Sequence, residues 1–174
     1  MNVQEATTRR LPDLKERHLP ENCRETINTI LKETYGYEQF RNLEIYDDLS
    51  KGKEKLCISQ GQLIENVILE AEKAWKSETQ VDNILLTAPT GSGKSLLFQL
   101  PAIYLGKEYN LLTIVVSPLK ALIVDQVESL QELGYARVAY ASSDLSPEQK
   151  MEVYRQGREG EIDLFYLSPE LLLS

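Results

Sequence analysis

Residues 83–98, Asn83-Ile-Leu-Leu-Thr-Ala-Pro-Thr-Gly-Ser-Gly-Lys-Ser-Leu-Leu-Phe98, combine three local patterns in a fixed order. The apolar run at residues 84–86 predicts a short buried strand of a parallel sheet. A turn over residues 88–93 contains two glycines, and a helix is predicted from Lys94 and Ser95 onward. A strand, a glycine-rich turn and a helix in this order are typical of a phosphate-binding loop.

The residue types in this turn suit phosphate binding. Gly91 and Gly93 allow backbone conformations that other residues avoid, so successive N–H groups can converge on phosphate oxygens. The positive end of the following helix adds its dipole. Lys94 is the candidate catalytic cation for the outer phosphates, and the Ser95 hydroxyl is the candidate ligand of Mg²⁺. The other candidate phosphate-binding residues are Pro89, Thr90 and Ser92.

The spacing of the motif is A-x-x-x-x-G-K-S, with Ala88 where the strict motif has glycine. The alternative interpretation is an ordinary glycine turn between a strand and a helix. The strand and helix patterns on either side favour the phosphate-binding loop.

The composition, 42% hydrophobic and 26% charged residues among 174, is typical of a globular protein. Because no apolar run has the length of a membrane span or of a signal peptide, we expect a cytoplasmic or nuclear protein that is not secreted. The net charge of −8 argues against a surface that coats nucleic acid indiscriminately, but it permits local contacts with a strand. Cys23 and Cys57 lack metal-site spacing, and the single histidine is His18, so we expect free thiols rather than a zinc site.

The chain before the phosphate-binding loop is predicted to contain a flexible arm over residues 1–23 and a helical region over residues 24–82. In that region we expect a helix that Gly36 ends, an irregular inserted loop over residues 42–59, and an amphipathic helix over residues 61–76. The inward positions are Ile27, Ile30 and Leu31 in the first helix and Leu63, Ile64, Val67, Ile68, Ala71 and Trp75 in the second. From the residues alone, the aromatic cluster over residues 35–40 is either core packing or a ligand platform.

Residues 83–174 alternate between strand and helix patterns. Beyond residues 84–86, strands are predicted at residues 111–116, 138–140 and 163–167. The helix after the phosphate-binding loop should kink or break at Pro101 and end near Gly106. Two further helices are predicted, one with Leu122, Ile123, Val127 and Leu130 facing inward and one capped by Ser146 with Pro147 at its first position. This alternation predicts an α/β fold in which helices cover both faces of a parallel sheet.

Three of the predicted strand ends carry a hydroxyl residue beside a proline, at residues 88–90, 117–118 and 168–169. Parallel strands end at the same edge of a sheet, and ligands of such sheets bind there. Hydroxyls and helix N-termini suit the phosphates of a nucleotide or of a nucleic-acid strand. The alternative is that these turns only cap the helices that follow.

With these residues in view, the chain resembles the first RecA-like motor domain of superfamily-two helicases, and most of all the RecQ family. The segment Ala88-Pro-Thr-Gly-Ser-Gly-Lys-Ser with Phe98-Gln-Leu-Pro-Ala102 resembles motif I of that family. Val115-Val-Ser-Pro-Leu-Lys-Ala-Leu-Ile-Val-Asp-Gln-Val127 resembles motif Ia, and Tyr166-Leu-Ser-Pro-Glu170 resembles the turn that contacts the loaded strand. Tyr35-Gly-Tyr-Glu-Gln-Phe-Arg41 resembles the aromatic and arginine part of the adenine-reading motif.

The resemblance implies a three-layer αβα P-loop NTPase fold, incomplete here and preceded by a helical segment. It implies ATP and Mg²⁺ as cofactors and single-stranded or partly duplex DNA as partner, with RNA possible. Tyr37 would pack near the adenine, while Arg41 and Gln62 (or Gln60) would hydrogen-bond its edge. Candidate contacts to strand phosphates are Ser117, Lys120, Ser168 and Ser142 or Ser143.

Two departures from the family pattern affect these expectations. The glutamine follows the arginine almost at once in the family, whereas about twenty residues intervene here, and we favour a loop that bulges out and leaves the glutamine in place. The chain also ends before an Asp-Glu-Ala-His-like segment and lacks a second RecA-like domain with its arginine finger. Because phosphoryl transfer depends on such parts, we expect the 174 residues alone to bind nucleotide poorly and to hydrolyse little.

The sequence therefore predicts the ATP-binding portion of an ATP-dependent RecQ-like DNA helicase, with 3′ to 5′ movement implied by the resemblance. The alternatives are a P-loop nucleotide-binding module without motor activity and a superfamily-two helicase that acts on RNA. Stimulation of ATP turnover by one nucleic acid would distinguish them.

Overall fold

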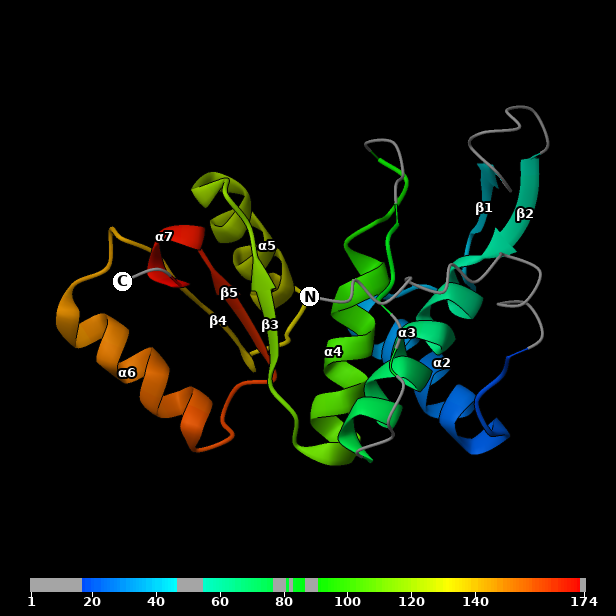
Figure 1. Cartoon of the computed structure of the whole chain (residues 1–174), viewed down its shortest axis with the longest axis horizontal. Coiled ribbons are helices and arrows are strands. Elements are labelled where there is room, and N and C mark those ends of the chain that lie inside the picture. The colour runs from blue at the N-terminus through cyan, green and yellow to red at the C-terminus, as the bar shows by residue number, and fades with distance from the viewer. Residues whose placement is uncertain (1–16, 47–54, 77–80, 82, 87–90, 173–174) are drawn as a thin grey trace, which may run out of the picture. The chain divides into compact units, whose positions relative to one another are not determined.

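The computed structural model describes residues 17–46, 55–76, 81, 83–86 and 91–172. The chain forms two compact units, the first from residues 1–28 and 38–101 and the second from residues 29–37 and 102–174. Two helices, α2 (Glu21–Tyr35) and α4 (Leu96–Tyr109), contribute residues to both units. Figure 1 labels the elements in chain order.

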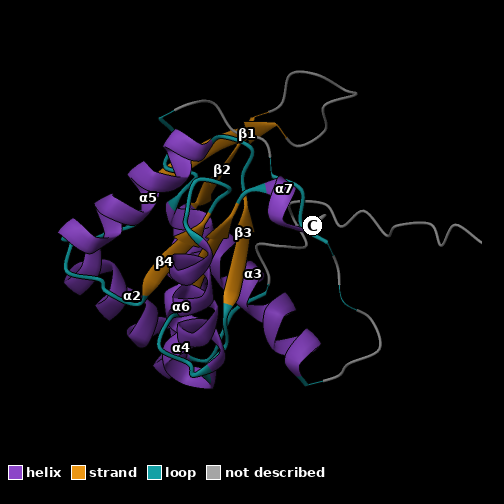
Figure 2. Ribbon diagram, turned by 90° about the vertical axis from the view of Figure 1, so that its left-hand side faces the viewer, coloured by secondary structure: helices purple, strands orange, loops and turns teal. Residues whose placement is uncertain are grey.

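A parallel sheet organises the second unit, which confirms the predicted fold class. Its strands are β3 (Thr113–Val116), β4 (Val138–Ala141) and β5 (Leu164–Leu167), in the order β3-β5-β4. The connection from β3 to β4 carries α5 (Lys120–Glu132), and the return from β4 to β5 carries α6 (Pro147–Arg158). The helices α5 and α6 cover opposite faces of the sheet (Figures 1 and 2), as expected for right-handed crossovers that run in opposite directions across it.

The core of the second unit forms around β5, whose four residues are all buried. Phe165 and Leu167 pack with Ala141 and Ile162 on one face, where α6 residues also contact them. The buried side of α5 consists of Ile123, Val127 and Leu130, as predicted. The prediction for Leu122 was wrong: its side chain is 45% exposed, because it lies one position off this stripe.

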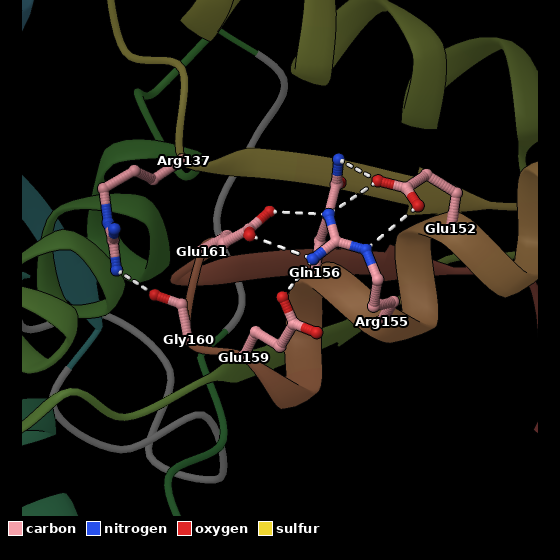
Figure 3. Close-up of polar contacts among 7 residues, drawn as sticks. All are labelled: Arg137, Glu152, Arg155, Gln156, Glu159, Gly160 and Glu161. Carbon is pink, nitrogen blue, oxygen red and sulfur yellow. Dashed lines mark hydrogen bonds and ion pairs between the residues drawn. The ribbon is translucent and has the colours of Figure 1, made fainter.

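Polar contacts hold both ends of α6, and Figure 3 shows those of Arg155 near its C-terminal end. At the start, the Ser146 hydroxyl accepts from the Gln149 N–H and the Gln149 side chain accepts from the Ser146 N–H, which confirms the predicted cap. Near the end, Arg155 donates to the carboxylates of Glu152 and Glu161 and also contacts Glu159. The chain then runs through β5 into α7 (Pro169–Leu172).

In the first unit the central helix is α3 (Gln60–Trp75), with Leu63, Ile64 and Ile68 buried as predicted. Trp75 differs from the prediction because it is the last residue of α3 and is 56% exposed. The predicted arm is only partly a separate segment. Residues 1–16 lie outside the described residues, residues 17–20 contact α3 through the pairs Arg17–Glu70 and Leu19–Glu65, and residues 21–23 begin α2.

The region expected to be an irregular loop, residues 42–59, contains two strands. Strands β1 (Asn42–Tyr46) and β2 (Lys55–Ser59) pair antiparallel, with Asn42 opposite Ser59. We call this pair the β1–β2 ribbon. Residues 47–54 lie outside the described residues. The sequence prediction gave weight to the charged run and overlooked the alternation of apolar residues at 43, 45, 56 and 58, which is the pattern of a two-stranded ribbon.

Residues 83–86 do not form the predicted strand. Ile84 and Leu85 are 48% and 91% exposed, and no described strand pairs with this segment. The outer edge of β3 also has no partner among the described strands, and Ile114 and Val116 beside it are about half exposed. A strand is stable only when a neighbour satisfies its backbone groups, so the apolar pattern alone was not sufficient.

Helix α4 continues through both residues that were expected to interrupt it. It runs unbroken past Pro101 and ends at Tyr109, where Asn110 takes a left-handed conformation with φ 52°. Gly106 lies inside the helix and does not end it. A glycine at this position allows Asp163 to pack closely, because an added Cβ would lie 2.2 Å from Cγ of Asp163. Leu100 and Ala102 beside Pro101 are fully buried, so tertiary packing holds the helix together at that point.

Asp163, which is 1% exposed, anchors the start of β5. Its carboxylate accepts from Arg137 at 2.7 and 2.8 Å and from the Tyr135 hydroxyl. Arg137 also donates to the Gly160 carbonyl at 2.7 Å (Figure 3). Burial, followed by the hydrogen bond to Asp163, raises the pKa of Tyr135.

Candidate functional site

The predicted phosphate-binding loop lies directly before α4. Gly91 and Gly93 both have φ 79°, the left-handed region that other residues rarely adopt. Lys94 and Ser95 form a turn whose carbonyls accept from Leu97 and Gln99, so they precede the helix instead of opening it. The Lys94 side chain is exposed and Ser95 is half-buried. Ala88, Pro89 and Thr90 lie outside the described residues.

Gln60 contacts this loop from the first position of α3. Its Nε2 donates to the carbonyls of Ser92 and Gly93 at 3.4 and 3.5 Å, and its Oε1 accepts from the Arg41 N–H at 3.1 Å. The Gln60 N–H donates to the Arg41 carbonyl at 2.9 Å. Arg41 and Gln60 are therefore adjacent although residues 42–59 separate them in sequence. Residues 42–59 thus leave and rejoin the chain at one place, through the β1–β2 ribbon, while the adenine contact of a glutamine stays a prediction.

The other residues of the adenine-like motif are divided between the two units. Tyr37 belongs to the second unit, is 49% exposed and stacks on Tyr35 with ring centroids 6.4 Å apart. Gly36 between them has φ 68° and ends α2, as predicted. Burial raises the pKa of Tyr35. Arg41 is exposed, and Gln62 is half-buried in the first turn of α3.

Three of the predicted strand-contact serines lie side by side at the carboxyl edge of the sheet. In register, Val116 of β3 and Ala141 of β4 flank Leu167 of β5, so the residues that follow them are neighbours. The Ser117 N–H donates to the Leu167 carbonyl at 3.0 Å, and the Ser168 N–H donates to the Ala141 carbonyl at 3.3 Å. We call Ser117, Ser142 and Ser168 the serine row. The turn at residues 88–90 lies outside the described residues.

The members of the serine row differ in exposure. Ser117 is half-buried, whereas Ser142 and Ser168 are 4% and 0% exposed. The Ser168 hydroxyl lies close enough to Glu170 to lower the pKa of that carboxyl, but it makes no hydrogen bond of ordinary geometry.

Lys120, in the first turn of α5, reaches across to the loop after β4. Its Nζ lies 2.5 Å from the Ser143 hydroxyl and 2.9 Å from the Asp144 carboxylate. The hydrogen bond from Lys120 lowers the pKa of Asp144. Breaking an ion pair at the protein surface costs little free energy, because such pairs contribute only about 0–1 kcal/mol to stability. The pair of Lys120 and Asp144 is therefore a weak one that lies at the surface.

The sequence prediction missed two members of these sites. Asp144 was overlooked as the partner of Lys120, although its position after the β4 loop serines was visible. Phe40 was assigned only to the aromatic cluster, whereas its ring packs on Gly61, where an added Cβ would lie 2.6 Å from a ring carbon. The glycine next to Gln60 was the available signal for that close approach.

Comparison with known proteins assigns the family. The profile described as DEAD/DEAH box helicase matches residues 68–174, which is more than half of the chain. The chain belongs to the DEAD/DEAH box helicase family. The parallel sheet agrees with the RecA-like nucleotide-binding fold that the resemblance implied.

Several similar proteins carry RecQ or Q-like helicase names. The chain is 34% identical to an ATP-dependent DNA helicase RecQ from Synechocystis over 87% of this chain and 25% of that protein. It is 32% identical to an ATP-dependent DNA helicase Q-like 5 from Arabidopsis thaliana over 86% of this chain and 13% of that protein. A RecQ helicase from Bacillus subtilis is 32% identical over 84% of this chain and 20% of its own length. The chain thus spans about a quarter or less of the length of these relatives.

Among the described residues, no helix has both the length and the apolar character of a membrane span.

Proposed function

We propose that this chain is the nucleotide-binding portion of an ATP-dependent RecQ-like DNA helicase, and that it binds Mg-ATP through residues 89–95 and a single DNA strand through the serine row and Lys120. The observation that carries the proposal is the pair of left-handed glycines directly before α4. The named relatives are ATP-dependent DNA helicases, which is the basis for choosing DNA over RNA.

The residues of the loop fit a triphosphate. An added Cβ at Gly91 would meet nothing within 4 Å, so the backbone there is open to an approaching ligand. Lys94 follows the second left-handed glycine and is exposed, which places a cation where the outer phosphates would lie. Ser95 would supply the hydroxyl for Mg²⁺, which prefers oxygen ligands and keeps most of its waters. When bound, the ion would neutralise charge on the outer phosphates.

Strand binding is supported by the chemistry of the serine row. Hydroxyl groups and helix N-termini at the carboxyl edge of a parallel sheet are typical phosphate ligands. Lys120 is the cation of this edge. The net charge of −8 then restricts binding to this local surface, because the remainder of the chain repels phosphate.

The test is the affinity of the chain for a labelled single-stranded DNA oligonucleotide at several salt concentrations, with and without a non-hydrolysable Mg-ATP analogue. We expect affinity to fall with salt at a log–log slope of about 0.7 per neutralised phosphate. Lys120→Ala should lower the affinity and the slope, whereas the matched control Lys107→Ala, in the last turn of α4, should not. A flat salt response, or equal loss in both variants, would contradict the strand contact. Tighter binding of an RNA oligonucleotide would favour the RNA-acting alternative.

A further inference from the structure

The Gln60 side chain is committed to contacts within the protein. It is 2% exposed, its Oε1 faces the Arg41 N–H, and its Nε2 lies between the carbonyls of Ser92 and Gly93. These partners fix which end of the amide is oxygen and which is nitrogen. The two distances to the loop carbonyls, 3.4 and 3.5 Å, exceed the usual range because one nitrogen serves two acceptors.

The Gln60 side chain is in close contact with the backbone of Gly93. An added Cβ at Gly93 would lie 2.5 Å from the Gln60 Nε2. Gly93 is therefore required twice, once for its left-handed backbone and once for the close approach of Gln60. The Gln60 side chain rests directly on the backbone of the phosphate-binding loop.

The other end of the amide is fixed to the base of the β1–β2 ribbon. The Gln60 N–H donates to the Arg41 carbonyl at 2.9 Å, which closes the ribbon. The Ser59 hydroxyl caps α3 by accepting from the Gly61 N–H at 3.2 Å, and the Phe40 ring packs on Gly61. Rotation of the Gln60 side chain would break contacts with the loop and with the ribbon base together.

We propose that Gln60 is a positioning residue that braces the phosphate-binding loop against the base of the β1–β2 ribbon, and that it does not read the adenine edge. Any change at the ribbon base would then alter the loop directly. The inference rests on the nucleotide site proposed above, because the loop matters through the phosphates that it holds. In this arrangement, discrimination between bases falls to other groups of the motif, with Gln62 the other glutamine proposed for that role.

The first test measures hydrogen exchange of the amides of residues 91–95 in the nucleotide-free chain. Gln60→Glu keeps the acceptor for the Arg41 N–H and replaces the donor to the loop by an oxygen, which the Ser92 and Gly93 carbonyls repel. At pH 8 we expect these amides to exchange about fivefold faster or more, as the loss of one hydrogen bond implies, while amides of β5 are unchanged. Gln131→Glu, the same substitution at an exposed position of α5, is the matched control. Unchanged exchange in Gln60→Glu would overturn the proposal.

The second test separates bracing from base reading by comparing the affinities for Mg-ATP and Mg-GTP. A brace acts on the phosphates that both nucleotides share, so Gln60→Glu should weaken both by the same factor. A reader of the adenine edge would weaken Mg-ATP alone, and that result would overturn the proposal. Gln62→Ala provides the contrast, since loss at a base reader should lower the preference for ATP over GTP.

A buried charge could unfold the chain, so Gln60→Leu serves as the second variant. It has similar volume and no charge, and it removes the same donor. Circular dichroism establishes that each variant is folded before exchange is measured. The nucleotide site and the brace can fail separately. If Lys94→Ala leaves the affinity for Mg-ATP unchanged, the proposed nucleotide site is wrong. The hydrogen exchange of residues 91–95, measured without nucleotide, still tests the brace in that case.

Discussion

Two apolar runs of similar appearance, Leu164-Phe-Tyr-Leu167 and Ile84-Leu-Leu86, have opposite structural outcomes. The first forms β5, which lies between two parallel neighbours and is buried along its whole length. The second has no ladder among the described residues, and Leu85 is 91% exposed. Both patterns indicate a buried strand, but among the described residues only the first is paired with neighbouring strands. An apolar run therefore indicates the need for burial, while its neighbours decide whether a strand forms.

The largest contrast is expected from one substitution made in both runs. Leu164→Ala removes a fully buried side chain and should lower the free energy of unfolding by about 2–5 kcal/mol. Leu85→Ala should change it by less than about 0.5 kcal/mol, because the side chain is already in water. Urea unfolding followed by circular dichroism measures both. Equal losses would mean that residues 84–86 are as well packed as β5.

The polar anchor of β5 gives a second contrast. Asp163→Ala leaves the Arg137 guanidinium and the Tyr135 hydroxyl without their acceptor, at a cost of about 2–3 kcal/mol. This cost lies below the roughly 3–5 kcal/mol of breaking a fully buried ion pair, because the Arg137 side chain is 45% exposed. Glu161→Ala, which interrupts the exposed Arg155 contacts, is the control and should cost less than about 1 kcal/mol. Denaturant titration of the two variants compares them, and similar costs would show that Asp163 does not anchor the strand.

Alanine substitutions at two helical glycines distinguish the effect of close packing on stability from the effect of helix propensity. Gly106→Ala should destabilise the chain by about 1–3 kcal/mol, because the new methyl group would collide with Asp163. Gly157→Ala, in α6, meets its nearest atoms at 3.6 and 3.7 Å, so the gain in helix propensity should stabilise the chain by up to about 1 kcal/mol. Thermal unfolding reports the sign of each change. A stabilising Gly106→Ala would contradict the packing described for α4 against β5.

The smallest effect on stability is expected at the edge of β3 that pairs with no described strand. Ile114→Lys places a charge at a side chain that is 54% exposed and should change the free energy of unfolding by less than about 0.5 kcal/mol. Because charges on an edge strand oppose pairing with another edge, the variant should also self-associate less than the parent. Sedimentation at several concentrations measures this. Strong destabilisation would mean that the edge is covered.

The sequence allowed the second unit to be predicted well, because its elements depend on local signals that agree with one another. The Ser146 cap, the stripe of Ile123, Val127 and Leu130, and the β-branched run of β3 each indicate the structure that forms. The crossing of α4 past Pro101 could not be predicted, since tertiary burial overrode a local signal.

The residue types of the candidate site are a sequence prediction, whereas the contacts among them come from the structure. Lys94, Ser95 and the left-handed glycines follow from motif spacing, and the serine row follows from parallel strand ends. The role of Gln60 depends on a contact between residues more than thirty positions apart, and no periodicity encodes such a contact. The β1–β2 ribbon was hidden by its charged centre, which is typical of a surface loop.

The most direct test of the account is a calorimetric titration of Mg-ATP into the chain and into Lys94→Ala, with Lys107→Ala as the control for loss of one positive charge. The account predicts saturable binding at one site that Lys94→Ala weakens at least tenfold and Lys107→Ala leaves unchanged, since the loop lysine contacts the outer phosphates. Equal affinity of the parent chain and Lys94→Ala for Mg-ATP would contradict the assignment of the phosphate-binding loop and the function proposed from it.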